Sequence, residues 1–165
     1  LPQAVMCMIY FAFVRSDVLY GIEVYGNTTF NHLSKLIVLN NKLLRILQYK
    51  QIETDLFILY KTHLTLQLHL LHNFQVLVFM HTYVYHRNKL SSVFSTYFEE
   101  NKLVHHYHTR QRDDFHSHSV RTETGKRNIK FKGTRLWNSL PIDFKHTVST
   151  TNFRNKLKHY LLQSM

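Results

Sequence analysis

The chain has 165 residues, of which 44% are apolar and 14% aromatic, with 21 Lys and Arg against 10 Asp and Glu. This composition can build a core and argues against a disordered linker, and the single cysteine excludes an internal disulfide framework, a cysteine-rich zinc site and an iron–sulfur cluster. The net charge of +11 favours a polyanionic partner, with nucleic acid expected first and an anionic membrane surface second.

The first half of the chain is predicted to be helical. Gln3–Tyr25 is rich in large apolar residues and predicts a helix that is interrupted near Gly21. A second helix is expected over Asn31–Gln48, capped by its first residue and apolar along one stripe. Thr54 is the expected N-cap of a short helix over Asp55–Lys61.

The middle of the chain is harder to interpret. Leu64–His86 begins with alternating leucines and continues with helical spacing, and we predict a helix because a single strand of this length is unusual. A further helix is expected over Leu90–Phe98. The last helix should be capped by Ser149 or Thr150, and its apolar face comprises Phe153, Leu157, Tyr160 and Leu161.

Charge is distributed unevenly along the chain. Residues 1–100 carry eight basic and six acidic side chains, residues 101–135 carry nine and three, and residues 136–165 carry four and one. The predicted fold is mainly α: a small helical bundle over 1–100, a basic extended or β segment over 101–135, and a C-terminal part over 136–165. That last part combines a LWNSLP turn with an amphipathic helix.

The basic segment is the candidate nucleic-acid interface. Cations can neutralise phosphates, and interleaved aromatic rings can stack on unpaired bases. If Asn128–Lys132 is a strand, Lys130 and Lys132 share its outward face. The residues expected to bind nucleic acid are Arg110, Arg112, Lys126, Arg127, Lys130, Lys132, Arg135 and Tyr107. The alternative is a solvated face that serves only solubility.

A short amphipathic turn follows the basic segment. It contains the only tryptophan of the chain and should stop near a proline, which cannot continue a helix. These residues are expected to anchor the basic arm to the helical body rather than to read bases. They are Leu136, Trp137, Leu140 and Pro141.

Neither a metal site nor a catalytic site is predicted. Five histidines lie within fourteen residues: His105, His106, His108, His116 and His118. Imidazole groups can bind zinc, but we favour the interpretation that these residues form a solvated loop. Asp113 and Asp114 would point to opposite faces of an extended chain, so they rarely form a metal site alone. No nucleotide-binding, zinc-protease or nucleophile-elbow motif occurs.

Four motifs, in order, resemble the C-terminal portion of reverse transcriptases from non-LTR retrotransposons of the LINE class, such as the jockey-like groups. Tyr20–Asn27, YGIEVYGN, is similar to the YGIxxWGN of that family. Leu36–Gln48 resembles its LQNKALRII-like helix, and His105–Arg110 resembles its HxYxTR pattern. Gly125–Pro141 resembles its glycine-flanked basic stretch ending in LWNSLP. Together these motifs span nearly the whole chain.

The resemblance implies that the chain is the thumb and post-thumb portion of an RNA-directed DNA polymerase. The palm aspartates of that family would precede Leu1, so no catalytic residue is carried over and this chain is expected to need no cofactor, whereas the parent would use Mg²⁺. The chain lacks an initiator methionine, which agrees with a fragment. The expected partners are RNA or an RNA–DNA duplex and the missing fingers and palm domains. An intracellular location is expected, either nuclear or cytoplasmic.

Two other interpretations remain open. Tyr25, His108 and Gln67 depart from the residues usual in the family, which would fit a diverged, non-functional relic of a retroelement. A helical protein-interaction module without a nucleic-acid role would also fit the composition. Membrane association through Leu64–His86 is not favoured, because that segment contains several polar side chains.

Overall fold

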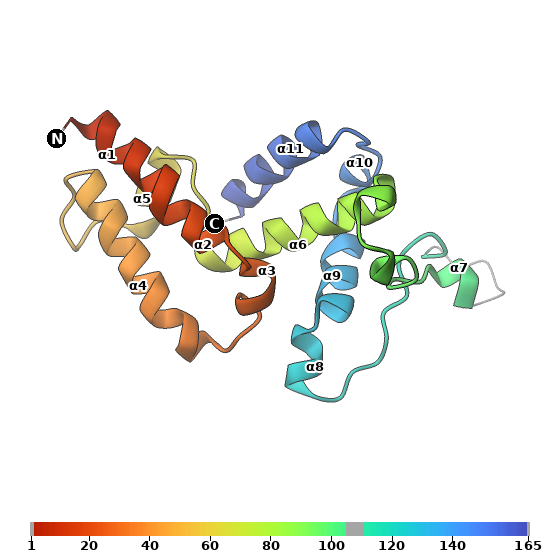
Figure 1. The fold of residues 1–165 in the computed structure, drawn as a ribbon. Coiled ribbons are helices and arrows are strands. Elements are labelled where there is room, and N and C mark those ends of the chain that lie inside the picture. Colours follow the sequence, from red (N-terminus) through yellow and green to blue (C-terminus); the bar gives the residue numbers. More distant parts are fainter. Residues whose placement is uncertain (1, 105–110, 165) are drawn as a thin grey trace. The chain divides into compact units, whose positions relative to one another are not determined.

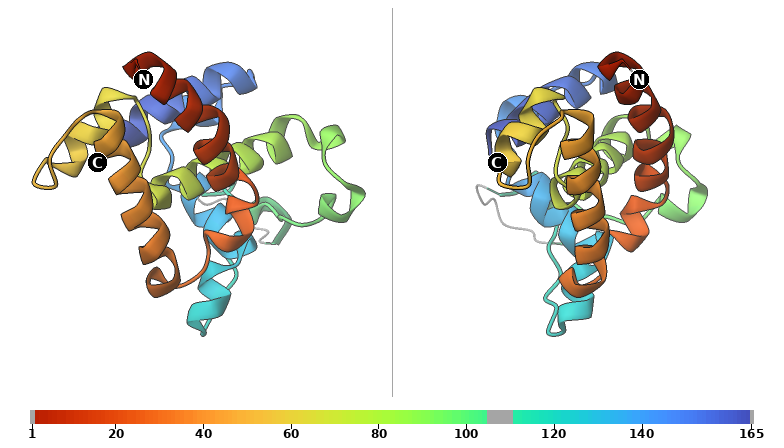
Figure 2. Two further views of the ribbon diagram at one scale, coloured as in Figure 1. Left: turned by 60° about the vertical axis from the view of Figure 1, so that its left-hand side comes forward. Right: turned by 90° about the vertical axis from the view of Figure 1, so that its left-hand side faces the viewer.

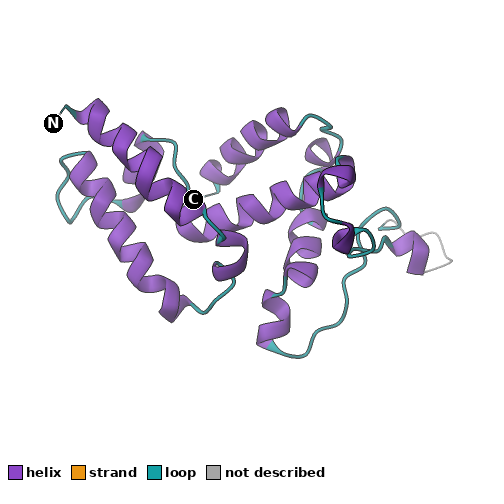
Figure 3. Cartoon of the chain, in the orientation of Figure 1, coloured by secondary structure: helices purple, strands orange, loops and turns teal. Residues whose placement is uncertain are grey.

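The computed structural model describes residues 2–104 and 111–164, and its regular structure is helical (Figures 1 and 3). The mainly α fold predicted from the sequence is therefore confirmed. Across the described residues no strand forms, and the only β-type pairing is an isolated antiparallel bridge between Glu100 and Phe115.

The chain divides into two compact units. The first comprises Leu1–His72 with His159–Met165, and the second comprises Asn73–Lys158. The composition boundaries near residues 100 and 135 both fall inside the second unit.

The first unit opens with a nearly continuous helical segment. Helix α1 (Gln3–Ile9) passes through a π-helical turn (Tyr10–Val14) into α2 (Arg15–Leu19). Gly21 then adopts a φ of 67°, in the left-handed region that favours glycine, before the short helix α3 (Ile22–Tyr25). The predicted interruption near Gly21 is confirmed.

Two further helices complete the first unit before α6. Helix α4 spans Phe30–Leu47 and α5 spans Leu56–Thr62, close to the predicted ranges. The predicted caps are wrong. Asn31 lies inside the first turn of α4, and α5 is capped by Asp55 rather than Thr54, because the Asp55 carboxylate accepts a first-turn backbone N–H at 3.0 Å.

A buried cluster joins these helices, and its core members are Tyr10, Leu44, Leu47 and Tyr60. Two asparagines of α4, Asn40 and Asn41, are also buried, and their side chains form hydrogen bonds with tyrosines of this cluster. The Tyr10 hydroxyl donates to Asn40 Oδ1 at 2.8 Å, and Asn40 Nδ2 donates to the Tyr60 hydroxyl at 2.9 Å. The Tyr60 hydroxyl donates in turn to Asn41 Oδ1 at 2.6 Å. Burial raises the pKa of Tyr60 to about 12, so its hydroxyl stays a donor.

Helix α6 (Leu68–Tyr85) runs on from the first unit into the second. It begins four residues later than predicted, because Leu64 has a φ of 48°, which is not helical. The helix predicted over Leu90–Phe98 is wrong: only short 3₁₀ turns form, at Arg87–Lys89 and Ser92–Phe94. The chain is extended at the start of this range, with a ψ of 154° at Leu90, which ends the first turn.

The remaining helices are α7 (Asn101–Val104), α8 (Glu123–Arg127), α9 (Ile129–Asn138), α10 (Ile142–Lys145) and α11 (Thr150–Gln163). Helix α11 confirms the predicted last helix. Its expected cap Ser149 lies directly before it, and the Ser149 hydroxyl accepts the N–H of Asn152 at 3.5 Å.

A β conformation of the basic segment is not confirmed: residues 116–121 have no regular structure, and a helix covers most of the range Asn128–Lys132, for which the sequence pattern allows a strand. Asn128 caps a helix instead: its side-chain oxygen accepts the backbone N–H of Lys130 at 2.8 Å, and α9 follows. In a helix, residues two apart differ by about 200° around the axis, so Lys130 and Lys132 point to different sides. The shared face expected for these two lysines does not form.

Helices α9 and α11 both pack against the second-unit part of α6 (Figures 1 and 2). The Trp137 ring of α9 lies 5.9 Å from Phe153 of α11 and 6.5 Å from His81 of α6, centroid to centroid. Gly133 allows the close approach of α9, because a Cβ there would lie 3.0 Å from Met80 Sδ. This aromatic core fixes the position of α9, which carries most of the site described next.

Candidate nucleic-acid interface

Three of the predicted cations line one hollow in the second unit. This hollow, called the basic groove here, has a volume of about 500 Å³. Its lining residues are Gln111, Ser117, Lys126, Phe131, Lys132, Arg135, Leu136, Asn138 and Ser139. None of these described lining residues is acidic. The groove combines three positive charges with polar groups and one half-buried aromatic ring, that of Phe131.

Local capping determines where the cations lie. The Thr122 hydroxyl accepts the N–H of Gly125 at 3.1 Å and begins α8, which places Lys126 in its last turn. Gly125 suits this position, because a Cβ there would lie only 2.3 Å from Val120 Cγ1 and would displace that side chain. After the cap at Asn128, α9 presents Lys132 and Arg135 three residues apart, on the same side of the helix.

Residues 111–117, which form a turn followed by the bridge residue Phe115, close the other side of the groove. Asn138 of α9 holds Phe115 at both backbone atoms: the Phe115 N–H donates to Asn138 Oδ1 at 3.1 Å, and Asn138 Nδ2 donates to the Phe115 carbonyl at 2.8 Å. This two-point contact fixes residues 111–117 beside α9. Gln111 and Ser117 consequently reach the groove wall.

The three cations differ in their surroundings. Lys126 Nζ lies 2.6 Å from Glu123 Oε1 in an exposed pair, which stabilises the helix little. Arg135 lies over the Phe131 ring, with Cζ 5.6 Å from its centroid, so the ring orients the guanidinium group. Burial lowers the pKa of Lys132, because desolvation disfavours the charged ammonium. A phosphate in the groove would counter that cost, since attraction is stronger where water is partly excluded.

The other predicted binding residues lie elsewhere. Lys130 Nζ lies 5.9 Å from the Tyr97 ring centroid and lines a separate hollow of about 310 Å³. Arg112 and Arg127 do not line the basic groove. Arg110 and Tyr107 lie outside the described residues. The basic groove thus brings together three of the seven cations that were predicted from the sequence to bind nucleic acid.

The predicted anchor residues have different environments. Trp137 and Leu140 are buried, with 5% and 7% of their surface exposed, and Trp137 packs in the aromatic core. Leu136 is half-buried and lines the groove. Pro141 is exposed and, with a ψ of 149°, is the extended residue before α10.

Sequence reasoning missed the polar wall formed by Gln111 and Ser117. These residues reach the groove only because Asn138 holds the distant backbone of Phe115. No local sequence pattern predicts the contact between Asn138 and Phe115, because neither residue belongs to a recognisable motif. The pairing of Lys126 with Glu123 did have a signal, namely opposite charges three residues apart in a helix.

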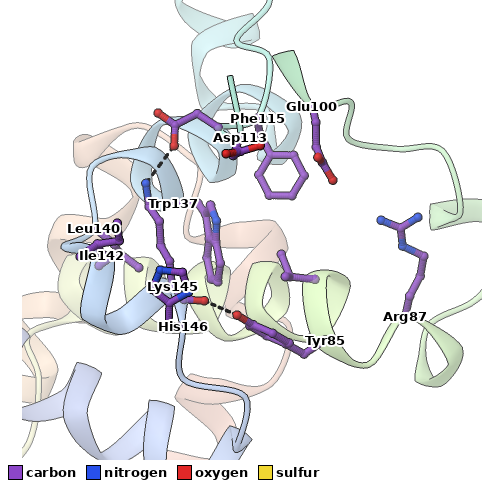
Figure 4. A pocket seen from close by; sticks show the side chains of 12 residues that line it. Tyr85, Arg87, Glu100, Asp113, Phe115, Trp137, Leu140, Ile142, Lys145 and His146 are labelled. Carbon is purple, nitrogen blue, oxygen red and sulfur yellow. Dashed lines mark hydrogen bonds and ion pairs between the residues drawn. The ribbon is translucent and has the colours of Figure 1, made fainter. Parts of the chain in front are cut away.

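A second hollow in the same unit, of about 480 Å³, has mixed charge (Figure 4). Its carboxylates are those of Glu100, Asp113 and Asp114, and Lys145 pairs with Asp114 at 2.9 Å. The Tyr85 hydroxyl, at the end of α6, donates to the Lys145 carbonyl and so holds the end of α10 against α6 (Figure 4). The three carboxylates of this lining outnumber its Lys and Arg side chains, Arg87 and Lys145, so this hollow does not extend the basic groove.

The described part of the histidine cluster contains His116 and His118, whose rings meet edge to face at 4.9 Å. His105, His106 and His108 lie outside the described residues. Within residues 2–104 and 111–164, no group of three His, Cys, Asp or Glu side chains is arranged to hold a metal ion. In the same ranges, none of the helices combines the length and the apolar character that crossing a bilayer requires.

Comparisons with protein-family models, with curated proteins and with solved structures find no match to this chain. The function of the basic groove is therefore inferred from the chemistry of its lining residues and from the sequence motifs.

Proposed function

We propose that this chain binds the sugar–phosphate backbone of RNA or of an RNA–DNA duplex through the basic groove, without sequence selectivity. The observation that carries the proposal is the gathering of Lys126, Lys132 and Arg135 on one hollow whose described lining contains no carboxylate. Phosphate contacts of this kind fix register on a nucleic acid but do not read its sequence.

The groove offers more than charge. The Phe131 ring lies in its wall beneath the Arg135 guanidinium group, and unpaired bases stack both on aromatic rings and on guanidinium planes. The side chains of Gln111 and Ser117 can donate hydrogen bonds to phosphate or sugar oxygens. The combination suits a single strand or an irregular duplex end, where bases are accessible to a ring.

We further propose that the chain is the thumb and post-thumb portion of a reverse transcriptase from a non-LTR retrotransposon. Four motifs in family order support this assignment, and the helical first unit is compatible with a thumb. In this proposal the chain grips the template–primer, while palm carboxylates elsewhere in the parent bind Mg²⁺ and perform polymerisation. The chain itself contributes no catalytic residue.

A matched pair of variants tests the binding proposal. The groove variant carries Lys126→Gln, Lys132→Gln and Arg135→Gln. The control variant removes three charges from exposed positions of the same unit outside the groove, through Lys89→Gln, Arg154→Gln and Lys156→Gln. The ligand is a fluorescent single-stranded RNA or RNA–DNA duplex, and binding is measured by anisotropy.

The proposal expects the groove variant to lose at least about tenfold in affinity at about 0.1 M salt, while the control loses much less. Equal losses in the two variants would show that net charge alone drives binding, and would contradict a groove. An RNA of unrelated sequence should bind the wild type with similar affinity, because contacts from Lys126, Lys132 and Arg135 to phosphates carry no sequence information.

A further inference from the structure

A surface of the first unit that follows α4, with Met6 of α1 and residues just after α4 in its lining, combines exposed aliphatic side chains with cations. A hollow of about 630 Å³ lies along the C-terminal half of α4 and is called the α4 groove here. Its apolar lining includes Val38, Ile46 and Ile52, and Ile46 and Ile52 are 63% and 85% exposed. Its cations are Lys42, Arg45 and Lys50.

The spacing of these residues follows the helix. Val38, Lys42 and Ile46 are each four residues apart, so they form one row along α4 that alternates apolar and basic side chains. A smaller hollow of about 390 Å³ continues the surface toward the start of the helix and is lined by Lys35, Val38 and Leu39, among others. The surface therefore follows most of the length of α4.

Burial of the aliphatic side chains favours an apolar occupant. Three cations favour a negatively charged one, since no described residue of the lining is acidic. An amphipathic helix meets both needs, because it presents an apolar ridge at i, i+3, i+4 and i+7 and can carry acidic residues beside that ridge. We propose that the α4 groove docks an acidic amphipathic helix of a partner protein.

Two other occupants fit the surface less well. A nucleic-acid backbone would satisfy the cations but would leave Ile46 and Ile52 against a charged surface, without burial of their aliphatic area. An anionic bilayer could accept both kinds of side chain, but its flat surface does not fill a concave hollow of this size. Both occupants are outcomes of the test below.

The probe is a fluorescent peptide of about 18 residues, a length that matches α4, with leucines at helical ridge positions and glutamates beside them. A scrambled peptide of identical composition keeps the charge but loses the ridge. The groove variant is Lys42→Glu with Ile46→Asp, both exposed positions, and the control variant is Lys89→Glu with Val93→Asp, exposed in the second unit. Circular dichroism verifies that both variants keep their helix content.

The proposal expects the ordered peptide to bind the wild type at least about tenfold more tightly than the scrambled peptide, and expects the groove variant to lose at least about tenfold while the control does not. A peptide with one glutamate replaced by lysine should recover affinity for a Lys42→Glu variant. Equal binding of ordered and scrambled peptides, or no binding, would overturn the proposal. Binding to phosphatidylserine vesicles or to RNA that is lost in the groove variant, without peptide binding, would also overturn it.

Discussion

His81 and Phe153 stack nearly face to face, with ring centroids 4.3 Å apart and an interplanar angle of 24°. This contact joins α6 to α11 in the centre of the second unit. His81 Nε2 donates to the Thr147 carbonyl at 2.7 Å, and Nδ1 is buried without a hydrogen-bond partner among the described residues. Burial lowers the pKa of His81, so the folded protein favours the neutral ring.

The His81 environment predicts a dependence of stability on pH. The unfolded chain binds a proton at His81 near the ordinary pKa of 6.5, whereas the folded chain binds it only at lower pH. The contribution of His81 is therefore complete above about pH 6.5 and is lost as pH falls below that value toward the lowered pKa.

Denaturant unfolding of the wild type and of His81→Phe, followed by circular dichroism from about pH 7.5 to about pH 5.5, checks this expectation. The wild type should lose more of its free energy of unfolding over this range than the variant does. His159→Asn, at an exposed position, should keep the wild-type slope. Identical slopes for wild type and His81→Phe would contradict a neutral buried histidine.

Trp137 should be one of the largest single contributors to stability in the second unit. It is buried between rings of α6 and α11, so Trp137→Ala leaves a cavity and is expected to cost about 3–5 kcal/mol. Trp137→Phe should cost less, because a ring remains. Urea unfolding followed by circular dichroism measures both values, and a cost below about 1 kcal/mol for the alanine variant would show that the core does not depend on this ring.

Removal of the Tyr60 hydroxyl should destabilise the first unit. This hydroxyl accepts from Asn40 and donates to Asn41, so Tyr60→Phe leaves two buried amide groups each short of one partner. The expected cost is about 1–3 kcal/mol in the free energy of unfolding. Tyr20→Phe, at a tyrosine of the first unit that is 87% exposed, serves as the control and should change stability by less than about 0.5 kcal/mol.

Gly133 should tolerate no β-branched side chain. A Cβ at this position would already lie 3.0 Å from Met80 Sδ, so Gly133→Val forces α9 away from α6 and should cost about 1–3 kcal/mol. The double variant with Met80→Ala should be more stable than the sum of the two single changes predicts, because removal of the thioether makes room. Simple additivity would show that the two helices do not meet at this point.

The helical class and most long helices could be predicted from the sequence, because apolar periodicity acts locally. Asn31–Gln48 and the C-terminal helix are close to α4 and α11 for this reason. The prediction over Leu90–Phe98 is wrong because tertiary contacts prevail: Phe98 packs edge to face on Tyr83, with centroids 4.9 Å apart, while the backbone between stays irregular.

The candidate site also has some features that follow from the local sequence and others that depend on contacts between residues far apart in the sequence. The basic character of the segment around Lys126 and Lys132 is plain from composition, and so its interpretation as a phosphate-binding region could be reached from sequence. Its conformation could not, because the alternating Ile129–Lys132 pattern resembles a strand, and the Asn128 cap decides for a helix. The groove itself depends on Asn138 holding Phe115, a contact between residues 23 apart.

The salt dependence of RNA–DNA duplex binding tests the central claim most directly. Each phosphate contact makes the plot of log affinity against log salt steeper by about one unit. The account therefore predicts that the slope of the triple groove variant is shallower than that of the wild type by about 2–3 units. The Lys89, Arg154 and Lys156 control variant should keep the wild-type slope. A groove variant whose slope equals that of the wild type would contradict the claim that Lys126, Lys132 and Arg135 hold the phosphate backbone.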